Sequence, residues 1–330
     1  MICLVTGATG FVGSAVARKL IAAGHEVRVL VRAGSDRRNL VGLDAAPVTG
    51  SLDDHASLAP AMKGCEALFH VAADYRLWVP EPARMYRTNV DGTVALMEAA
   101  LAAGVSRVVH TSSVATLGLL PDGADADEAT PVSLDQMVGP YKRSKYLSEE
   151  AVQRLVRERQ LPAVIVNPST PVGPRDVKPT PTGRTILEAA SGRMPAFVDT
   201  GLNFAHVDDV AEGHLLAFDK GRIGERYILG GENLTLRALL AMIAGMSGRK
   251  PPTISLPIDL LMPLAYGAEL YARITGKEPF VTRDGLTLAR KKMFFTIAKA
   301  RRELGYAPRP AEDGIRDAIE WFRANNYIAG

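Results

Sequence analysis

The sequence predicts an α/β protein built on a doubly wound parallel sheet, with a smaller, mostly helical C-terminal part. Three observations support this prediction. An apolar run at the N-terminus leads directly into a glycine-rich turn and a helical stretch. Strand and helix patterns then alternate through the first half of the chain, as in parallel sheets covered by helices. From Pro168 the pattern changes to a proline-rich segment followed mainly by helices.

The glycine-rich turn lies in residues 2–13, ICLVTGATGFVG. The apolar run Ile2–Val5 predicts a strand, and Ser14–Ala23 predicts the helix that follows. Gly7, Gly10 and Gly13 lie between them in the spacing G-x-x-G-x-x-G, which indicates a dinucleotide-binding turn of the Rossmann type. Gly7 would allow the tight turn, Gly10 the approach of a pyrophosphate, and Gly13 close packing of helix on strand. The pyrophosphate would lie at the helix N-terminus, where free N–H groups favour an anion.

Length and composition exclude several classes of protein. The chain has 330 residues, 47% hydrophobic and 23% charged, which is typical of a globular protein of one large or two modest domains. A net charge of +3 is too small to indicate a nucleic-acid partner. Cys3 and Cys65 lack metal-ligand spacing and suit a reducing compartment. The glycine turn follows the N-terminus too closely for a cleavable signal peptide. We therefore expect a cytoplasmic protein without a metal site.

The segment Leu256–Tyr271 is apolar but is interrupted by Pro257, Asp259, Pro263 and Glu269. It falls short of the ~18 uninterrupted apolar residues that a membrane-spanning helix needs. We expect a buried helix here, with contact to a membrane surface as the alternative.

The remaining elements of the first half alternate in type. Strands are expected at Val27–Arg32, Ala67–Val71, Val105–Thr111 and Ala163–Asn167, and helices at Ala15–Ala23, Leu58–Met62, Met85–Ala103 and Tyr141–Gln160. This order predicts helices on both faces of a parallel sheet, with ligands bound outside the carboxyl ends of the strands.

The second half begins with an irregular segment, residues 168–183, that contains five prolines. Loops of this length are usually functional or disordered. A strand is expected around Phe204–His206, and helices at Thr185–Ser191, Val210–Phe218, Leu236–Met246, Leu260–Ile274 and Gly314–Asn325. We divide the chain into a nucleotide-binding domain, 1–167, and a substrate-binding domain, 168–330, with some segments crossing back to the first.

Candidate catalytic groups lie on one expected helix and at the end of one expected strand. Tyr141 and Lys145 are four residues apart and share one face of a helix. A lysine ammonium beside a phenol favours the phenolate, so Lys145 is expected to lower the pKa of Tyr141 toward neutrality. Thr111-Ser112-Ser113 ends a strand, and a hydroxyl there can hydrogen-bond a substrate oxygen.

Taken together, these motifs resemble the extended branch of the short-chain dehydrogenase/reductase superfamily, the NAD-dependent epimerase/dehydratase family. The matching pieces occur in family order over roughly residues 1–215: Thr6–Gly13, His70–Ala73, Asn89–Thr93, Thr111–Gly118, Tyr141–Lys145, Asn167–Ser169 and His206–Val210.

The resemblance implies a Rossmann fold that binds NAD(P), with Tyr141 as acid/base and Lys145 at the nicotinamide ribose. It also implies that Ser113 orients the substrate oxygen, with Ser112 as the alternative hydroxyl. The cofactor-binding residues that it implies are Gly7, Thr9, Gly10, Phe11, Val12, Gly13, Arg32, Leu52, Ala72, Ala73, Asn89, Thr111, Tyr141, Lys145, Pro168 and Ser169. Asn89 is expected to be either a structural link or a cofactor contact.

The end of the second strand favours NADP over NAD. NAD-binding members carry an acidic residue there that binds the ribose hydroxyls. This chain has Val31 at that position, followed by Arg32, whose guanidinium matches a 2′-phosphate. Ser35, Arg37 and Arg38 could add to the same pocket.

The loop after Asn167, PSTPVGPRDVKPTPTG, resembles the hopanoid-associated sugar epimerase subgroup, often called HpnA. Arg175 and Lys178 in this loop would bind a phosphate or carboxylate of the substrate. The resemblance therefore implies an epimerase for a nucleotide sugar or hopanoid-linked sugar, acting by transient hydride transfer.

Two alternatives to the epimerase stay open. One is an NADPH-dependent reductase of the dihydroflavonol-4-reductase or 3β-hydroxysteroid dehydrogenase type, acting on a bulky substrate such as a lipid-linked one. The other is a non-catalytic dinucleotide sensor. A dehydratase is disfavoured because Thr111-Ser112-Ser113 contains no carboxylate. The helices Met85–Ala103 and Tyr141–Gln160 correspond to those that pair relatives into a homodimer, which we expect here as well.

Overall fold

A computed structural model of the protein describes residues 1–328. Its centre is a parallel sheet of seven strands in the order β10-β6-β5-β4-β1-β2-β3. The strands are β1 Ile2–Thr6, β2 Glu26–Val31, β3 Ala45–Thr49, β4 Ala67–His70, β5 Arg107–Thr111, β6 Ala163–Pro168 and β10 Arg226–Leu229. The strand order reverses between β1 and β4, which creates a crevice at the carboxyl ends of these two strands.

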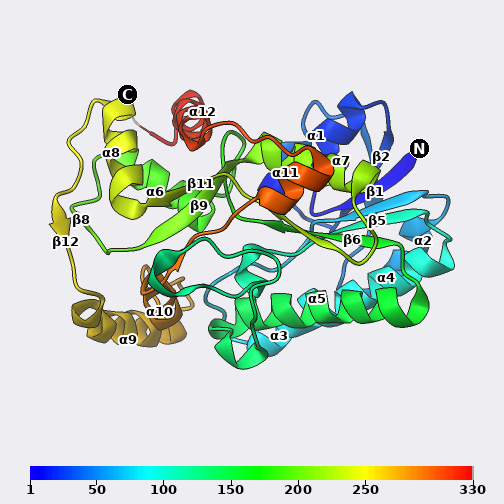
Figure 1. The fold of residues 1–330 in the computed structure, drawn as a ribbon, viewed down its shortest axis with the longest axis horizontal. Coiled ribbons are helices and arrows are strands. Elements are labelled where there is room, and N and C mark those ends of the chain that lie inside the picture. Colours follow the sequence, from blue (N-terminus) through cyan, green and yellow to red (C-terminus); the bar gives the residue numbers. More distant parts are fainter. Residues whose placement is uncertain (329–330) are drawn as a thin grey trace.

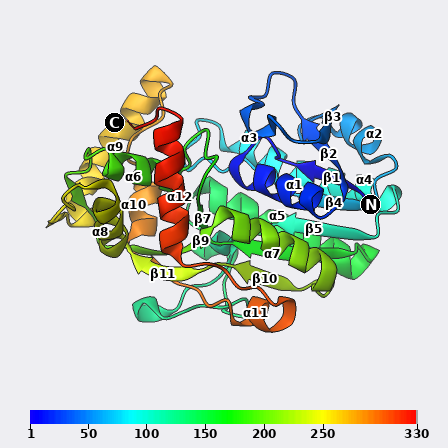
Figure 2. The same ribbon diagram turned by 90° about the horizontal axis from the view of Figure 1, so that it is seen from above.

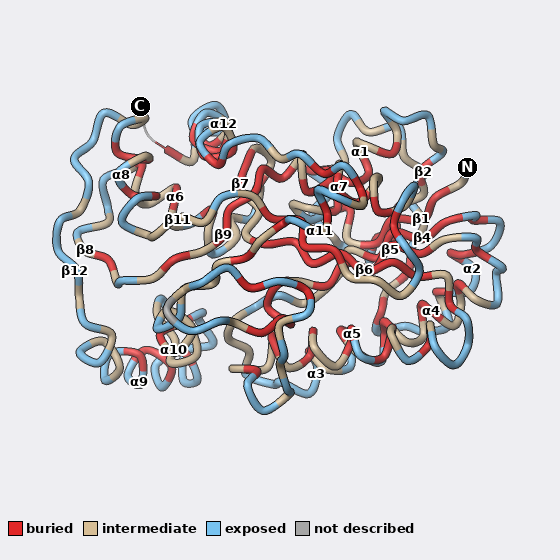
Figure 3. The backbone as a smooth tube through the Cα atoms, viewed as in Figure 1, coloured by how far each residue is buried: buried red, intermediate tan, exposed pale blue. Residues whose placement is uncertain are grey.

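Helices cover both faces of this sheet (Figures 1 and 2). One face carries α1 Phe11–Ala22, α7 Val207–Lys220 and α11 Ala298–Leu304, and the other carries α2 Leu58–Met62, α4 Gly92–Ala102 and α5 Gly139–Arg159. Because side chains alternate along a strand, Cys3 and Val5 of β1 enter one buried cluster while Leu4 enters the other. Burial on both faces explains the continuous apolar runs of the central strands, which lie in the buried centre in Figure 3.

The predicted doubly wound sheet is confirmed, but two of its strands were missed. β3 is an edge strand whose residues are largely exposed and include Pro47, so it carries no apolar run. β10 has four residues and reaches the opposite edge from the second half of the chain. Neither strand has a local signal strong enough to separate it from a loop.

A second layer lies beside the main sheet and is built from residues after Pro168. A small sheet contains β7 Thr170–Val172, β9 Gly201–His206, β11 Glu232–Thr235 and β13 Lys292–Met293, and β8 Ala196–Phe197 pairs with β12 Ile254–Ser255. Around them lie α6 Pro181–Ala190, α8 Leu236–Ser247, α9 Ile258–Thr275, α10 Arg283–Ala289 and α12 Ala311–Ala324. The inward faces of α6, α8 and α12 meet in a third buried cluster, which includes Ile186, Leu239 and Phe322.

Two helices differ from their predicted bounds for clear local reasons. α6 begins at Pro181, four residues before the expected start, because Pro181 occupies the first helical position and the hydroxyl of Thr180 caps the Gly183 N–H at 3.1 Å. The expected helix Met85–Ala103 is divided: α3 Pro82–Tyr86 passes through a π turn over Arg87–Asp91 into α4. Such turns are frequent at functional sites.

One prediction about burial was wrong. The apolar segment Leu256–Tyr271 does form most of a helix, α9, but that helix lies at the surface of the molecule (Figure 3). Most of its large apolar residues are exposed. The buried positions of α9 are Ala265, Ala268, Glu269 and Ala272, so three alanines and one ion-paired glutamate pack against the protein. The apolar side chains of the segment surround the helix, and hydrophobicity alone did not reveal which face the protein covers.

The division at residue 167 stays a prediction. β10, α7 and α11 belong to the second half of the sequence, yet they pack on the main sheet, in line with the expected crossing back. Pairing into a dimer also stays a prediction. Among the helices within residues 1–328, none combines the length and apolarity needed to cross a membrane.

The first testable prediction concerns Gly13. A Cβ at Gly13 would lie 2.2 Å from the Gly7 carbonyl oxygen, so Gly13→Ala should lower the free energy of unfolding by about 1–3 kcal/mol or more. Gly245→Ala is the matched control: Gly245 lies in α8 with no heavy atom near the added Cβ, and we expect a gain of about 0.5–1 kcal/mol. Urea unfolding measures both, and equal effects at the two positions would contradict the prediction.

Candidate active site

The glycine turn after β1 forms a cradle whose shape requires glycine. Gly7 has a φ of +73°, and its carbonyl accepts the Gly10 N–H at 2.9 Å. A Cβ at Gly7 would lie 2.8 Å from the backbone of Ala72, in the loop after β4. α1 then begins at Phe11 without a side-chain cap. Its first N–H groups are therefore suited to the pyrophosphate of a dinucleotide, so the residues present fit NAD(P).

Thr6 joins this cradle to the next loop, a role that was not predicted for it. Its hydroxyl accepts the N–H groups of Val71 and Ala72, each at 3.1 Å, and hydrogen-bonds Nδ1 of His70 at 2.8 Å. The loops after β1 and β4 are thereby held together at the crevice where the strand order reverses. The signal in the sequence was a threonine directly before the first glycine.

Tyr141, Lys145 and Ser113 come together at the carboxyl end of β5. Lys145 is buried on α5, and its Nζ donates to the Thr111 carbonyl at 2.8 Å. Ser113 follows β5, and its Oγ accepts the Ala115 N–H at 3.1 Å. Burial raises the pKa of Tyr141, and a hydrogen bond with the Ser113 side chain opposes that rise. Ser113 and Tyr141 therefore face one another.

The predicted effect of Lys145 on Tyr141 was wrong. Burial dominates the pKa of Tyr141 and raises it, and only Ser113 acts in the opposite direction. The ammonium of Lys145 is directed at the Thr111 carbonyl, and burial lowers its own pKa to about 8, against the charge of Glu149. The i, i+4 spacing placed the two residues on one helix face, but it did not reveal where the ammonium points.

The two candidate serines differ in their surroundings. The hydroxyl of Ser112 is buried and finds no hydrogen-bond partner within residues 1–328, and its N–H donates to the Val166 carbonyl at 2.8 Å. Ser113 is the serine that meets Tyr141. The geometry therefore agrees with the choice of Ser113 as the catalytic hydroxyl, which stays a prediction.

Glu149 is a buried carboxylate beneath the site that sequence reasoning missed. Its Oε2 accepts from Thr116 at 2.9 Å and from Asn167 at 3.0 Å, and its Oε1 accepts from Arg226 at 3.2 Å. It lies one turn after Lys145 on α5 and offsets part of the cost of charging that lysine. The available signal was its spacing, four residues after Lys145 and eight after Tyr141.

Asn89 lies in the π turn and connects the loop after β4 to α5. Its Oδ1 accepts the Asp74 N–H at 2.7 Å, and its Nδ2 donates to the Asp74 carbonyl at 2.9 Å and to Ser144 Oγ at 3.0 Å. These contacts use both ends of the amide and make Asn89 the structural link that was one of its two expected roles. Ala72 and Ala73 lie half-buried in the loop that Asn89 holds.

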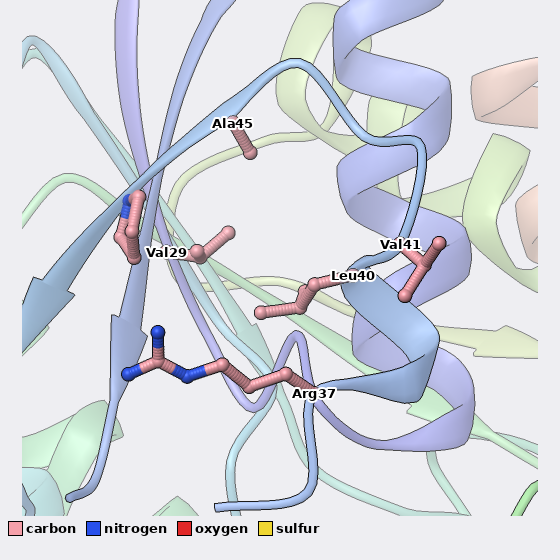
Figure 4. A pocket seen from close by; sticks show the side chains of 6 residues that line it. Val29, Arg37, Leu40, Val41 and Ala45 are labelled. Carbon is pink, nitrogen blue, oxygen red and sulfur yellow. The ribbon is translucent and has the colours of Figure 1, made fainter.

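The adenosine end of the candidate site lies beyond β2. Arg32 follows β2 and is exposed, with no ion pair inside the described chain. Arg38 differs, because it donates to Asp36 through Nη2 at 2.6 Å. Arg37 borders a shallow hollow of about 250 Å³ against β2 and β3, shown in Figure 4. Leu52 is buried against Gly92, at the start of α4.

The loop after β6 holds the other predicted ligand contacts. Pro168 ends β6, and Ser169 Oγ donates to the Asn203 carbonyl at 2.7 Å. Arg175 adopts a left-handed φ of +75° and forms an ion pair with Asp208. Lys178 is exposed.

Asp176, between these two cations, was not predicted to be a site residue. It is buried, and burial raises the pKa of its carboxyl to about 6, although Thr180 donates two hydrogen bonds to Oδ2. Its Oδ1 has no partner within the described chain. Asp176 also acts on Tyr75. Burial is the main cause that raises the pKa of Tyr75, and the negative charge of Asp176 raises it further.

The fold and the facing tyrosine, serine and lysine define a dinucleotide-dependent enzyme of the extended short-chain dehydrogenase/reductase type. The sequence profile of the NAD dependent epimerase/dehydratase family matches residues 3–230. The chain belongs to this family and is an NAD(P)-dependent enzyme.

Three similar proteins match this chain over nearly its whole length. A Synechocystis protein named putative dihydroflavonol 4-reductase is 42% identical over 328 residues, which are 98% of this chain and 95% of that protein. Sterol demethylase protein B of Methylococcus capsulatus is 37% identical over 330 residues, 99% and 100% of the two chains. The crystal structure of gox2253 is 58% identical, with a TM-score of 0.90 and 99% of each chain covered.

The second testable prediction is a loss of stability in acid. His70, His110 and His214 are buried, and burial lowers the pKa of all three, to about 3 for His70 and about 4 for His214. Unfolded histidine titrates at about pH 6.5, so below that pH the unfolded chain binds protons that the folded chain does not. The free energy of unfolding should therefore decrease as the pH falls from about 6.5 toward 4.

Urea unfolding at a series of pH values between 7.5 and 4.5 tests this prediction. Asp176, whose pKa is raised, acts in the opposite sense below about pH 6. A His70→Gln variant removes one of the three histidines and should show a shallower decline. Parallel pH profiles for this variant and the unsubstituted protein would contradict the assignment to His70.

Proposed function

We propose that the protein is a carbonyl reductase or alcohol dehydrogenase that uses NADP(H) and acts on a substrate without a phosphate group. The observation that carries this proposal is the combination of two arrangements. Tyr141 faces Ser113 beside the glycine cradle, as hydride transfer at a carbinol carbon requires. Arg175, in the loop after β6, is paired with Asp208, and Arg184, near the start of α6, lies beside Glu278.

Each of the three catalytic residues has a distinct role in this proposal. Tyr141 exchanges a proton with the substrate oxygen, and Ser113 holds that oxygen by a hydrogen bond. Lys145, with a pKa of about 8, is mostly charged at neutral pH, and its ammonium, held at the Thr111 carbonyl, would bind the nicotinamide ribose. Asn89 and Glu149 fix the positions of α5 and Lys145. NADP(H), when bound, supplies the hydride that the reaction needs.

The charge of the loop after β6 favours an uncharged substrate. A nucleotide sugar carries a diphosphate, whose oxygens match the planar guanidinium of an arginine. Arg175 is paired with Asp208, and Arg184 lies 3.7 Å from Glu278. The relative named as a reductase supports the same choice, since it matches nearly the whole length of the chain.

A sugar epimerase is the second candidate, and two observations favour it. The family is defined by epimerases and dehydratases, and Lys178 is an exposed cation without an ion-pair partner within residues 1–328. In an epimerase Tyr141 and Ser113 would act on the same oxygen, and hydride would return to the opposite face of the substrate. Such a reaction leaves no net change in the absorbance of NADPH, whereas a reductase consumes NADPH.

The third testable prediction is that Tyr141→Phe abolishes turnover but not cofactor binding. The enzyme is assayed with NADPH and, separately, a dihydroflavonol, a 3-ketosteroid and UDP-glucose. Removing the acid/base should lower kcat by about 10²–10⁴-fold on the accepted ketone, with the Kd for NADPH unchanged within a factor of about three. Epimerised UDP-glucose without NADPH consumption would overturn the reductase in favour of the epimerase, and full activity of the variant would exclude Tyr141 as the acid/base.

The fourth testable prediction concerns the choice of NADP. Arg32→Ala should weaken NADPH binding by roughly tenfold and leave NADH binding nearly unchanged, because a charge-assisted contact to a phosphate is worth about 1.5–3 kcal/mol. Arg38→Ala is the matched control, since Arg38 is held by Asp36, and a smaller effect is expected. Isothermal titration with both cofactors measures these changes, and equal losses for NADPH and NADH would refute a 2′-phosphate site at Arg32.

A further inference from the structure

The surface helix α9 exposes its large apolar side chains, whereas most surface helices bury them. Its buried positions are mainly alanines, Ala265, Ala268 and Ala272, and its large apolar side chains face outward. Figure 3 shows the helix at the edge of the molecule, largely in the colour of exposed residues. A surface helix normally turns its apolar face inward, so the outward apolar face of α9 indicates a surface that binds a partner.

The outward residues form one continuous strip. At 100° per residue, Leu260, Pro263, Leu264, Gly267, Leu270, Tyr271 and Ile274 fall on the same side of α9, and all of them are exposed. The five large side chains among them are between 49% and 77% exposed. Phe280, in the turn after the helix, is 75% exposed. We call these residues, with Phe280, the α9 strip. Contiguous apolar surfaces of this kind mark contacts with proteins or membranes.

The charges around the α9 strip distinguish between these two partners. The acidic groups of residues 249–291 are mostly neutralised: Asp259 is paired with Arg290, Glu269 with Arg283, and Glu278 lies near Arg184. Arg273, in the last turn of α9, and Lys277, just after the helix, are both exposed and have no ion pair within residues 1–328. The strip is therefore bordered by uncompensated positive charge.

We propose that the α9 strip docks on an anionic membrane surface. A second copy of this chain would bring the same unpaired cations together, whereas anionic headgroups complement them. An 18-residue helix lying in the interface inserts its apolar side chains without spanning the bilayer, and tyrosine and phenylalanine suit that depth.

α9 is connected through α10 to the start of α5, the helix that carries Tyr141. α10 packs on α9, and Asp284 of α10 lies against Gly139, the first residue of α5. Tyr141 is two residues further along. Docking through α9 would hold the start of the catalytic helix near the lipid surface; that consequence, unlike the docking itself, rests on the proposed function.

Vesicle sedimentation of the full chain tests the proposal without any assay of activity. The vesicles contain either phosphatidylcholine alone or phosphatidylcholine with 30% phosphatidylglycerol, each at low salt and at 0.5 M salt. The test variant is Leu260→Ser with Ile274→Ser, and the matched control is Val41→Ser with Ile223→Ser, two exposed apolar residues outside the α9 strip. All are exposed, so the melting temperatures should stay close to that of the unsubstituted protein.

Binding to the phosphatidylglycerol vesicles is expected, weakened by 0.5 M salt and reduced by at least roughly tenfold in the test variant but not in the control. Failure to bind these vesicles would overturn the proposal. So would equal binding by the test variant and the unsubstituted protein, or binding that salt does not change. A dimer in solution that the test variant alone dissociates, without vesicle binding, would assign the strip to a second copy instead.

Discussion

The close approach of backbone segments at the carboxyl end of β1 is the constraint on which the site depends. The Gly7 carbonyl leaves no room for a Cβ at Gly13, and the loop after β4 leaves none at Gly7. α1 can therefore begin directly above β1, and its free N–H groups point into the crevice where the strand order reverses. Thr6 keeps this arrangement by holding the β4 loop through two N–H groups and His70. The cradle is thus built from backbone, and side chains serve to hold it.

Buried charge is the second organising feature of the site. Lys145 lies where burial opposes its positive charge, and Glu149 is held one helical turn away by Thr116, Asn167 and Arg226. An ion pair in such a place adds little net stability, but removing one partner would leave the other uncompensated. The network therefore connects α5 to β6 and β10 and helps to fix how the helix lies on them, because Asn167 and Arg226 come from these strands. α5, which carries the residues proposed for catalysis, is thus positioned in part by β10, a strand from the second half of the sequence.

Much of the fold followed from local patterns, because the central strands are buried on both faces and read as continuous apolar runs. β1, β2, β4, β5 and β6 were all expected within two residues of their observed ends. The glycine spacing and the pair Tyr141 and Lys145 likewise depend on spacing within one element. β3 and β10 were missed because an exposed edge and a four-residue strand carry no such pattern. Glu149 and Asp176 were missed because only their burial distinguishes them from ordinary surface carboxylates. That burial depends on segments distant in sequence.

The sequence by itself determined the class of fold, the dinucleotide cradle and the identity of the three residues proposed for catalysis. These features rest on periodicity and on short spacings, which the chain carries locally. Only the tertiary structure decided what each charged group meets: Lys145 meets the Thr111 carbonyl, and Arg175 meets Asp208 from a distant helix. It also decided that α9 turns its alanines inward and its leucines outward. The physical reason is that pairing and burial are set by the packing of distant segments against one another, which no local pattern contains.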